Sequence, residues 1–78
     1  TYRPFYMLGE VNKPGTYPYA AGLTVLNAVA TAGGFTYRSD DRRVYIRRDG
    51  SLREEAFSLT SSLQVAPGDT IRIAERLF

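Results

Sequence analysis

Hydrophobic residues occur in short runs separated by turn-forming residues along this chain of 78 residues, a pattern typical of a small sheet protein. Residues 5–11 are mostly aromatic, aliphatic or β-branched, which predicts the first strand. Gly9 interrupts this run and indicates a bulge or a close approach by another backbone segment.

A hairpin is expected next. Pro14-Gly15 predicts a type II turn, because proline fixes φ at the second turn position and glycine supplies the positive φ of the third. Residues 16–19 then predict a second strand, with Tyr17 and Tyr19 on one face.

One short helix follows the hairpin. Thr24 can cap its first turn, and Gly33-Gly34 ends it, because glycine accepts the left-handed conformation just past a helix. The apolar positions of its buried stripe are predicted to be Leu26, Val29 and Ala30.

The second half of the chain predicts a second hairpin. Residues 44–47 alternate between apolar and polar side chains, as in a half-buried strand. Asp49-Gly50 is a favoured two-residue hairpin turn, so residues 52–59 are expected to return as the partner strand, with Phe57 and Leu59 on the same side.

A last strand is predicted at the end of the chain. Residues 63–65 lead into a second Pro-Gly turn at residues 67–69, and residues 70–73 form the strand, with Ile71 and Ile73 inward. The order is β-β-α-β-β-β. It predicts an α+β, β-grasp (ubiquitin-like) fold, in which one short helix packs on one face of a mixed sheet of about five strands.

A length of 78 residues predicts one domain, over residues 1–78. Hydrophobic residues make up 44% and aromatic residues 13%, as in globular proteins, and no apolar run approaches the length needed to cross a bilayer. The absence of Cys and His removes disulfides and the common zinc-ligand sets. Stability must therefore come from packing, or from neighbours in a larger assembly.

Three motifs in order carry a family resemblance. They are LGEVNKPGTY at residues 8–17, LTVLNA with AGGF at residues 23–35, and PGDTI at residues 67–71. Together they resemble the soluble ligand-binding β-grasp (SLBB) domain, in the version found in outer-membrane polysaccharide export proteins. The resemblance covers residues 5–78 and includes the ending ERLF.

This resemblance implies a non-catalytic periplasmic module of a ring-forming protein that exports capsule or exopolysaccharide. The implied partners are neighbouring subunits of a homo-oligomeric ring, acidic polysaccharide, and the inner-membrane machinery of polysaccharide biosynthesis and export. The full-length protein is expected at the periplasmic face of the envelope, associated with the outer membrane. Because the chain begins at Thr1 and not at a methionine, we expect a domain excised from a longer export protein.

Catalytic chemistry is not expected. There is no His or Cys, and Glu54 and Glu55 are adjacent on a predicted strand, so their side chains face opposite sides. Asp40 and Asp41 lie among arginines in a loop, where charge compensation on the surface is the simpler interpretation. We therefore expect no catalytic residue, cofactor or metal ion.

Binding is the more credible chemistry, and residues 37–48 are its best candidate. This stretch interleaves aromatic residues with five arginines and carries a net charge of +3. An aromatic ring can lie against the apolar face of a sugar while an arginine pairs with a uronic carboxylate. The candidate contact residues are Tyr37, Arg38, Arg42, Arg43, Tyr45 and Arg47.

Other interpretations of these residues stay open. The charged strand can be a solvated surface, or it can pair with acidic residues of the next subunit. Tyr17 and Tyr19 are candidates for an interface or ligand contact, although half-buried strand tyrosines more often belong to a core. A single-stranded nucleic-acid-binding domain and a ubiquitin-like protein-binding adaptor are the alternative functions. Nucleic acid is not expected as a partner, because a formal charge of +2 is far below that of dense phosphate-binding surfaces.

Overall fold

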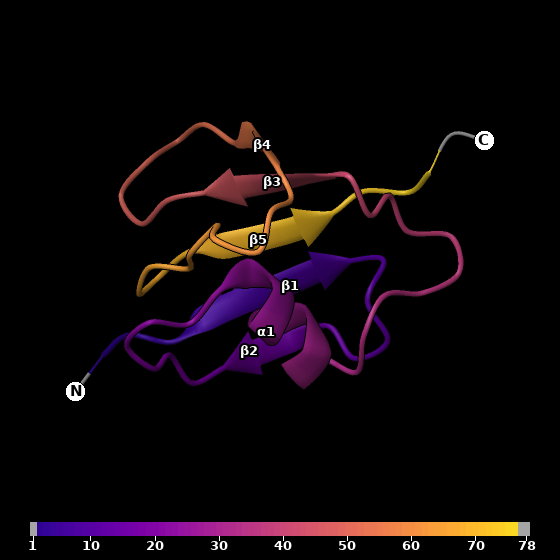
Figure 1. Ribbon diagram of the computed structural model, residues 1–78. Helices are drawn as coiled ribbons and strands as arrows, with labels where there is room; N and C mark the ends of the chain where they lie inside the picture. The colour runs from indigo at the N-terminus through magenta and orange to yellow at the C-terminus, as the bar shows by residue number, and fades with distance from the viewer. Residues whose placement is uncertain (1, 77–78) are drawn as a thin grey trace.

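The computed structural model describes residues 2–76 and contains one five-stranded sheet with a single helix on one face (Figure 1). The elements are β1 (Phe5–Gly9), β2 (Gly15–Tyr17), α1 (Val25–Thr31), β3 (Arg43–Arg47), β4 (Glu55–Ser58) and β5 (Thr70–Ile73). The predicted element order and the α+β, β-grasp fold are confirmed. Within residues 2–76 no helix has the length and apolar character needed to cross a membrane.

The first and last strands lie side by side at the centre of the sheet. The strand order is β2-β1-β5-β3-β4, and β1 pairs with β5 in parallel, with Met7 opposite Ile71. All the other neighbours are antiparallel. Residues 63–65 form no strand of this sheet; instead Gln64 makes an isolated bridge with Thr24, at the start of the helix.

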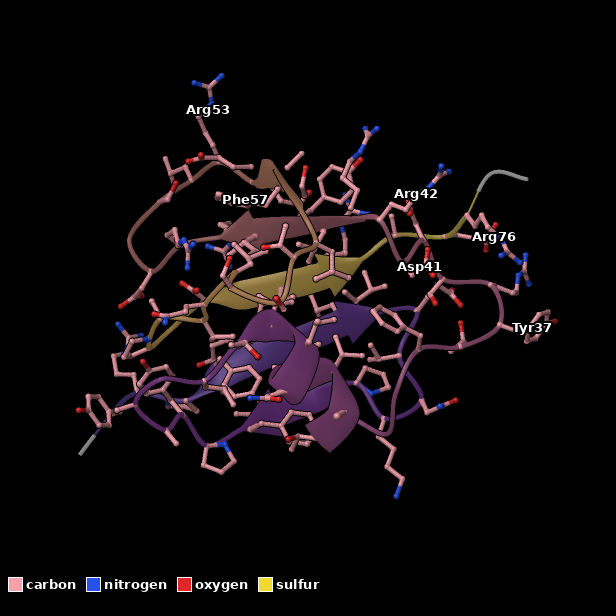
Figure 2. All side chains as sticks on the ribbon, viewed as in Figure 1. Tyr37, Asp41, Arg42, Arg53, Phe57 and Arg76 are labelled. Carbon is pink, nitrogen blue, oxygen red and sulfur yellow. The ribbon has the colours of Figure 1, made fainter. Side chains whose placement is uncertain are left out.

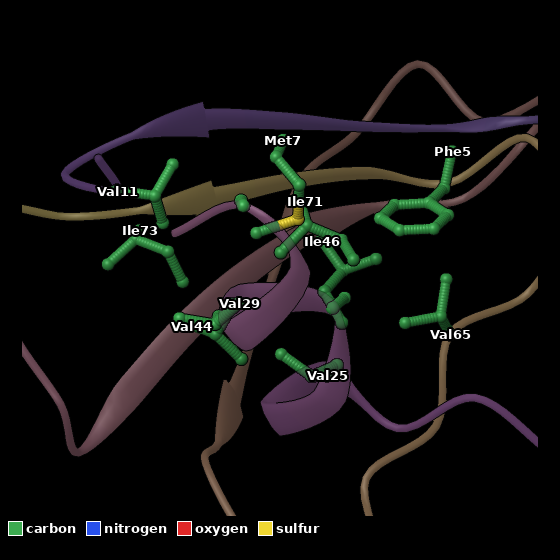
Figure 3. Close-up of a cluster of buried hydrophobic side chains, with 12 residues drawn as sticks. Phe5, Met7, Val11, Val25, Val29, Val44, Ile46, Val65, Ile71 and Ile73 are labelled. Atoms are coloured by element: carbon green, nitrogen blue, oxygen red, sulfur yellow. The ribbon is translucent and has the colours of Figure 1, made fainter. Parts of the chain in front are cut away.

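The core lies between α1 and the sheet (Figure 3). Alternate residues of the three central strands point toward the helix, as the period of two requires. The fully buried strand residues are Phe5, Met7, Val44, Ile46, Ile71 and Ile73. The inward orientation predicted for Ile71 and Ile73 is therefore confirmed.

The buried stripe of α1 differs from the predicted one. Val29 is buried as expected, but Leu26 and Ala30 are exposed. The buried helical positions are Val25, Ala28 and Val29, and Ala32 at the C-cap continues the stripe. Alanines at the contact between helix and sheet let the short helix lie close to the sheet. The prediction missed them because alanine contributes little to a hydrophobic pattern. The predicted cap at Thr24 is confirmed: its side chain accepts a hydrogen bond from Asn27 N at 3.1 Å.

Gly9 is the close-approach position that the sequence indicates. Its φ is +85°, and a Cβ built there would lie 2.2 Å from the carbonyl oxygen of Ile73. Only glycine fits between the two parallel strands at this point. The strand consequently ends at Gly9 and not at residue 11, and Val11 forms an isolated bridge with Phe35.

The two Pro-Gly pairs behave differently. Gly68 has φ +81° and Asp69 N donates to Ala66 O at 3.1 Å, which is the expected type II turn. Gly15 has φ +155° and is the first residue of β2, so the type II turn predicted there is wrong. The segment before Gly15 binds the end of the helix instead, since Lys13 N donates to Ala32 O.

The connection from β3 to β4 is longer than predicted. Asp49-Gly50 makes a turn, with Ser51 N donating to Arg48 O at 3.0 Å, but only the glycine has positive φ. A two-residue type I′ hairpin needs positive φ at both positions. Residues 48–54 therefore form a loop, and the partner strand begins at Glu55 and not at residue 52.

Candidate functional site

The face of the sheet opposite α1 carries the candidate chemistry, and we call it the open face. Strand alternation places on it the residues between the core positions. They include Tyr6 and Leu8 of β1, Arg43, Tyr45 and Arg47 of β3, and Thr70 and Arg72 of β5. All of these are partly or largely exposed.

One end of the open face contains a hollow of about 330 Å³ that is rich in arginine. We call it the basic hollow; it is lined by Asp40, Arg42, Arg43, Tyr45, Arg72, Ala74, Glu75 and Arg76. Figure 2 shows Arg42 and Arg76 at the end of the molecule where the loop before β3 meets the segment after β5. Four cationic and two acidic side chains thus surround a space open to solvent.

Backbone pairing brings this loop and the C-terminal segment together. Arg76 N donates to Arg38 O at 2.7 Å, and Asp40 N donates to Ala74 O at 2.8 Å. Ser39 and Glu75 form an antiparallel bridge between them. Arg42 and Arg76, far apart in sequence, consequently line the same hollow.

Arg72 is held rigidly at the inner wall of the basic hollow. Its Cζ lies 4.4 Å from the ring centroid of Tyr45, and its Nε and Nη2 donate to the two carboxylate oxygens of Glu54 at 3.0 and 2.8 Å. The hydrogen bonds from Arg72 hold the pKa of the Glu54 carboxyl below its usual value, and they raise the pKa of Arg72. The guanidinium therefore covers a face of the Tyr45 ring that a sugar would need for stacking.

Arg42 and Arg43 have guanidinium groups without a partner among residues 2–76. Both residues are exposed, and within residues 2–76 neither side chain makes a hydrogen bond or an ion pair. Arg38 instead pairs with Glu75 at 3.0 Å, and Arg76 donates to Tyr37 O at 3.0 Å. The two free arginines are thus the groups in the hollow best able to bind an added anion.

The other candidate residues lie in three further places. Tyr37 is 85% exposed at the outer end of its loop (Figure 2). Arg47 lies at the opposite end of β3, where it donates to Ser51 O and Thr70 Oγ1 at 3.3 and 3.4 Å.

Tyr17 and Tyr19 are separated from β3 by β1 and β5, and both pack against the core cluster. Tyr17 stacks on Phe5 with centroids 6.0 Å apart and donates a hydrogen bond to Lys13 O. Tyr19 meets the edge of Tyr2 at 5.0 Å. The structure therefore keeps these two tyrosines apart from the arginines of the open face.

Sequence reasoning missed Arg72 and Arg76. The alternation of β5 could have placed Arg72 on the face opposite Ile71 and Ile73. Its proximity to Tyr45, however, depends on the pairing of β3 with β5, which no local pattern reveals.

Within residues 2–76, four of the eight acidic side chains pair with arginines. Asp49 binds Arg3, and Asp69 binds Arg48 from a fully buried position. Asp40 accepts a hydrogen bond from Arg42 N at 2.9 Å. Within residues 2–76, acidic side chains nowhere gather in a group of three that could hold a metal ion.

Comparison with known proteins gives a relative and a family. The chain is 52% identical to the exopolysaccharide production protein ExoF of Rhizobium meliloti (strain 1021), in an alignment of 87 positions that includes 97% of this chain. It spans only 21% of that relative's length. Residues 4–55, more than half of the chain, match the SLBB domain family. The chain therefore belongs to the SLBB domain family.

Proposed function

We propose that this chain is a single, non-catalytic domain of a longer polysaccharide export protein, located at the periplasmic face of the envelope. The similarity to an exopolysaccharide production protein, which extends over 97% of the chain, supports this proposal. In this account the whole protein associates with the outer membrane and cooperates with inner-membrane machinery that makes and exports capsule or exopolysaccharide.

Within that protein, the basic hollow contacts an anionic glycan. The observation that carries this step is that Arg42 and Arg43 line the basic hollow and that their guanidinium groups have no partner among residues 2–76. Arginine presents a planar fork that matches a carboxylate, so a uronic acid or another acidic substituent fits there. Tyr37, almost fully exposed beside this end, is available to lie against a sugar ring.

The domain also contributes to assembly of a homo-oligomeric ring with neighbouring subunits. Within residues 2–76 its core has only twelve buried apolar residues, so contacts with neighbours supply further stability in this proposal. The regions outside this chain supply most of the ring contacts in this proposal. A non-catalytic role agrees with the lack of His and Cys, and within residues 2–76 arginines hold four of the carboxylates.

Nucleic-acid binding is less well supported. Proteins that bind single strands stack bases on open aromatic faces. In this domain Arg72 covers Tyr45, the aromatic residue that lines the basic hollow with Arg42 and Arg43. No specific feature of residues 2–76 favours a ubiquitin-like adaptor.

Calorimetric titration tests the proposed ligand class. Hexagalacturonate, neutral maltohexaose and a single-stranded oligothymidylate are titrated separately into the chain. We expect weak binding of the galacturonate, weakened further by salt, and no heat from maltohexaose. Tight, steeply salt-dependent binding of the oligonucleotide without any response to galacturonate would overturn the proposal.

A further inference from the structure

A second hollow lies on the open face, at the end away from the basic hollow. Its volume is about 480 Å³, and its lining includes Arg3, Tyr6, Leu8, Arg47, Asp49 and Thr70. It draws on β1, β3 and β5 and on the loop after β3, so three strands and a turn together shape it.

The floor of this second hollow is apolar. Leu8 is 46% exposed and Tyr6 is half-buried, although both lie in a strand at the centre of the sheet. Because they lie on the open face, their side chains do not pack into the core on the other face. An apolar floor of this kind suits the C–H face of a sugar ring.

The rim carries oriented charges. Arg3 binds the carboxylate of Asp49, and Asp49 packs directly on Gly68, where an added Cβ would lie 2.7 Å from its Cγ. Arg47 is held by Ser51 O and Thr70 Oγ1 and keeps further N–H groups free, since a guanidinium has several donors. The rim can therefore accept hydrogen bonds from hydroxyl groups and donate to an acidic substituent.

The two hollows are joined along β3. Arg43 lines the basic hollow and Arg47 the second one, and they lie four positions apart on the strand, or about 13 Å. Between them the sheet register sets Leu8 beside Arg72 and Arg72 beside Tyr45. Arg72, which lines the basic hollow, therefore lies opposite Leu8, which lines the second hollow.

We propose that the second hollow is a separate subsite for an acidic sugar residue, and that one extended anionic polysaccharide occupies both hollows by running along β3. This inference rests on the proposed function, because it assumes that the basic hollow binds an acidic glycan. A polymer with carboxylates at intervals matches a face on which cations recur along the strand. It deepens the function from contact with one acidic group to recognition of a chain segment.

Chain length tests the inference. Digalacturonate is too short to reach both hollows, whereas hexagalacturonate can span them and gains from the linked second contact. We expect the hexamer to bind the unaltered chain about tenfold more tightly than the dimer. In Arg3→Ala/Leu8→Thr, the hexamer should lose most of this advantage while the affinity for the dimer changes little.

Controls separate the two proposals. Arg53→Ala removes one charge from a residue that lines neither hollow, and it should leave both affinities unchanged. If the double variant Arg3→Ala/Leu8→Thr unfolds at a lower temperature, Arg3→Ala alone replaces it, because it removes only an exposed ion pair. This inference alone would be overturned if dimer and hexamer bind with equal affinity and if that binding is lost in Arg42→Ala/Arg43→Ala but kept in Arg3→Ala/Leu8→Thr. Failure of both lengths to bind would overturn the proposed function with it.

Discussion

The guanidinium of Arg72 lies over the ring of Tyr45, with Cζ 4.4 Å from the ring centroid. Glu54 holds the same guanidinium through both of its carboxylate oxygens. These contacts change the role of Tyr45, which the sequence offers as a platform for a sugar. In the folded domain its ring supports a cation whose charge is balanced by Glu54.

The pair of Glu54 and Arg72 predicts a specific dependence of stability on pH. The pKa of Glu54 is lower in the folded domain, so the pair stabilises the fold above the carboxyl's usual pKa. That contribution is lost as the pH falls through the lowered value. Glu54→Gln should therefore reduce the free energy of unfolding at pH 7 by less than about 1 kcal/mol, because the pair is partly exposed to solvent.

Urea denaturation at neutral and acidic pH measures this effect. The difference between Glu54→Gln and the unaltered chain should disappear once the pH is below the lowered pKa of Glu54. Glu55→Gln removes a neighbouring charge without an arginine partner within residues 2–76, and it should change stability by less than about 0.5 kcal/mol. A stability difference for Glu54→Gln that is the same at both pH values would argue against the pair.

Alanine substitutions at Gly9 and Gly22 distinguish the cost of close packing from the cost of backbone strain. Both have positive φ, but a Cβ at Gly9 would meet the Ile73 carbonyl at 2.2 Å, whereas one at Gly22 meets nothing within 4 Å. Gly22→Ala should cost about 1–2 kcal/mol from the left-handed conformation alone. Gly9→Ala should cost more than about 3 kcal/mol, because β1 and β5 must move apart. Thermal unfolding followed by circular dichroism compares them, and equal losses would refute the close approach.

The buried carboxylate of Asp69 predicts a rescue. Its Oδ2 accepts hydrogen bonds from the Arg48 guanidinium and from Ala66 N, and the side chain is fully buried. Arg48→Met leaves this charge without its cation and should cost about 3 kcal/mol or more. Adding Asp69→Asn removes the isolated charge and should restore part of the loss.

Urea denaturation at pH 7 measures the free energy of unfolding of Arg48→Met and of the double variant. Arg48 also lies over the ring of Phe57, at 5.4 Å from its centroid, so methionine is chosen to keep some of that packing. The account of a charge buried with its partner is wrong if the double variant is less stable than Arg48→Met.

Association of the isolated chain tests the proposal for the ring. Because most ring contacts are assigned to regions outside these residues, the chain should be a weakly associating monomer of 8.7 kDa. Light scattering over a range of concentrations measures the mass. A stable ring formed by this chain alone would contradict that assignment.

Local sequence signals predicted the parts of the fold that depend on neighbours in the chain. The strand over residues 70–73 was predicted with its observed bounds, because a Pro-Gly turn precedes it and apolar residues alternate within it. The close approach at Gly9 likewise follows from one glycine in a hydrophobic run. The helical stripe was misplaced, since Ala28 and Ala32 contribute little to a hydrophobic pattern although both are buried.

The candidate site was only partly predictable, since it depends on distant segments. Arg42 and Arg43 stood out as a basic cluster beside aromatic residues. Arg72 and Arg76 join them only because β5 pairs with β3 and the segment after β5 pairs with residues 38–40. The same long-range pairing makes Tyr45 a support for Arg72, a role that its own neighbours in sequence do not indicate.

Titration of hexagalacturonate into three proteins tests the central claim most directly: the unaltered chain, Arg42→Ala/Arg43→Ala and Arg53→Ala/Lys13→Ala. The two double variants remove the same charge, but the second removes it from residues outside both hollows. We predict that Arg42→Ala/Arg43→Ala loses at least about tenfold in affinity and keeps its thermal stability, because two charge-assisted contacts are removed from an exposed surface. The control should bind like the unaltered chain. Equal affinity in all three proteins, or an equal loss in both double variants, would contradict binding of an anionic glycan in the basic hollow.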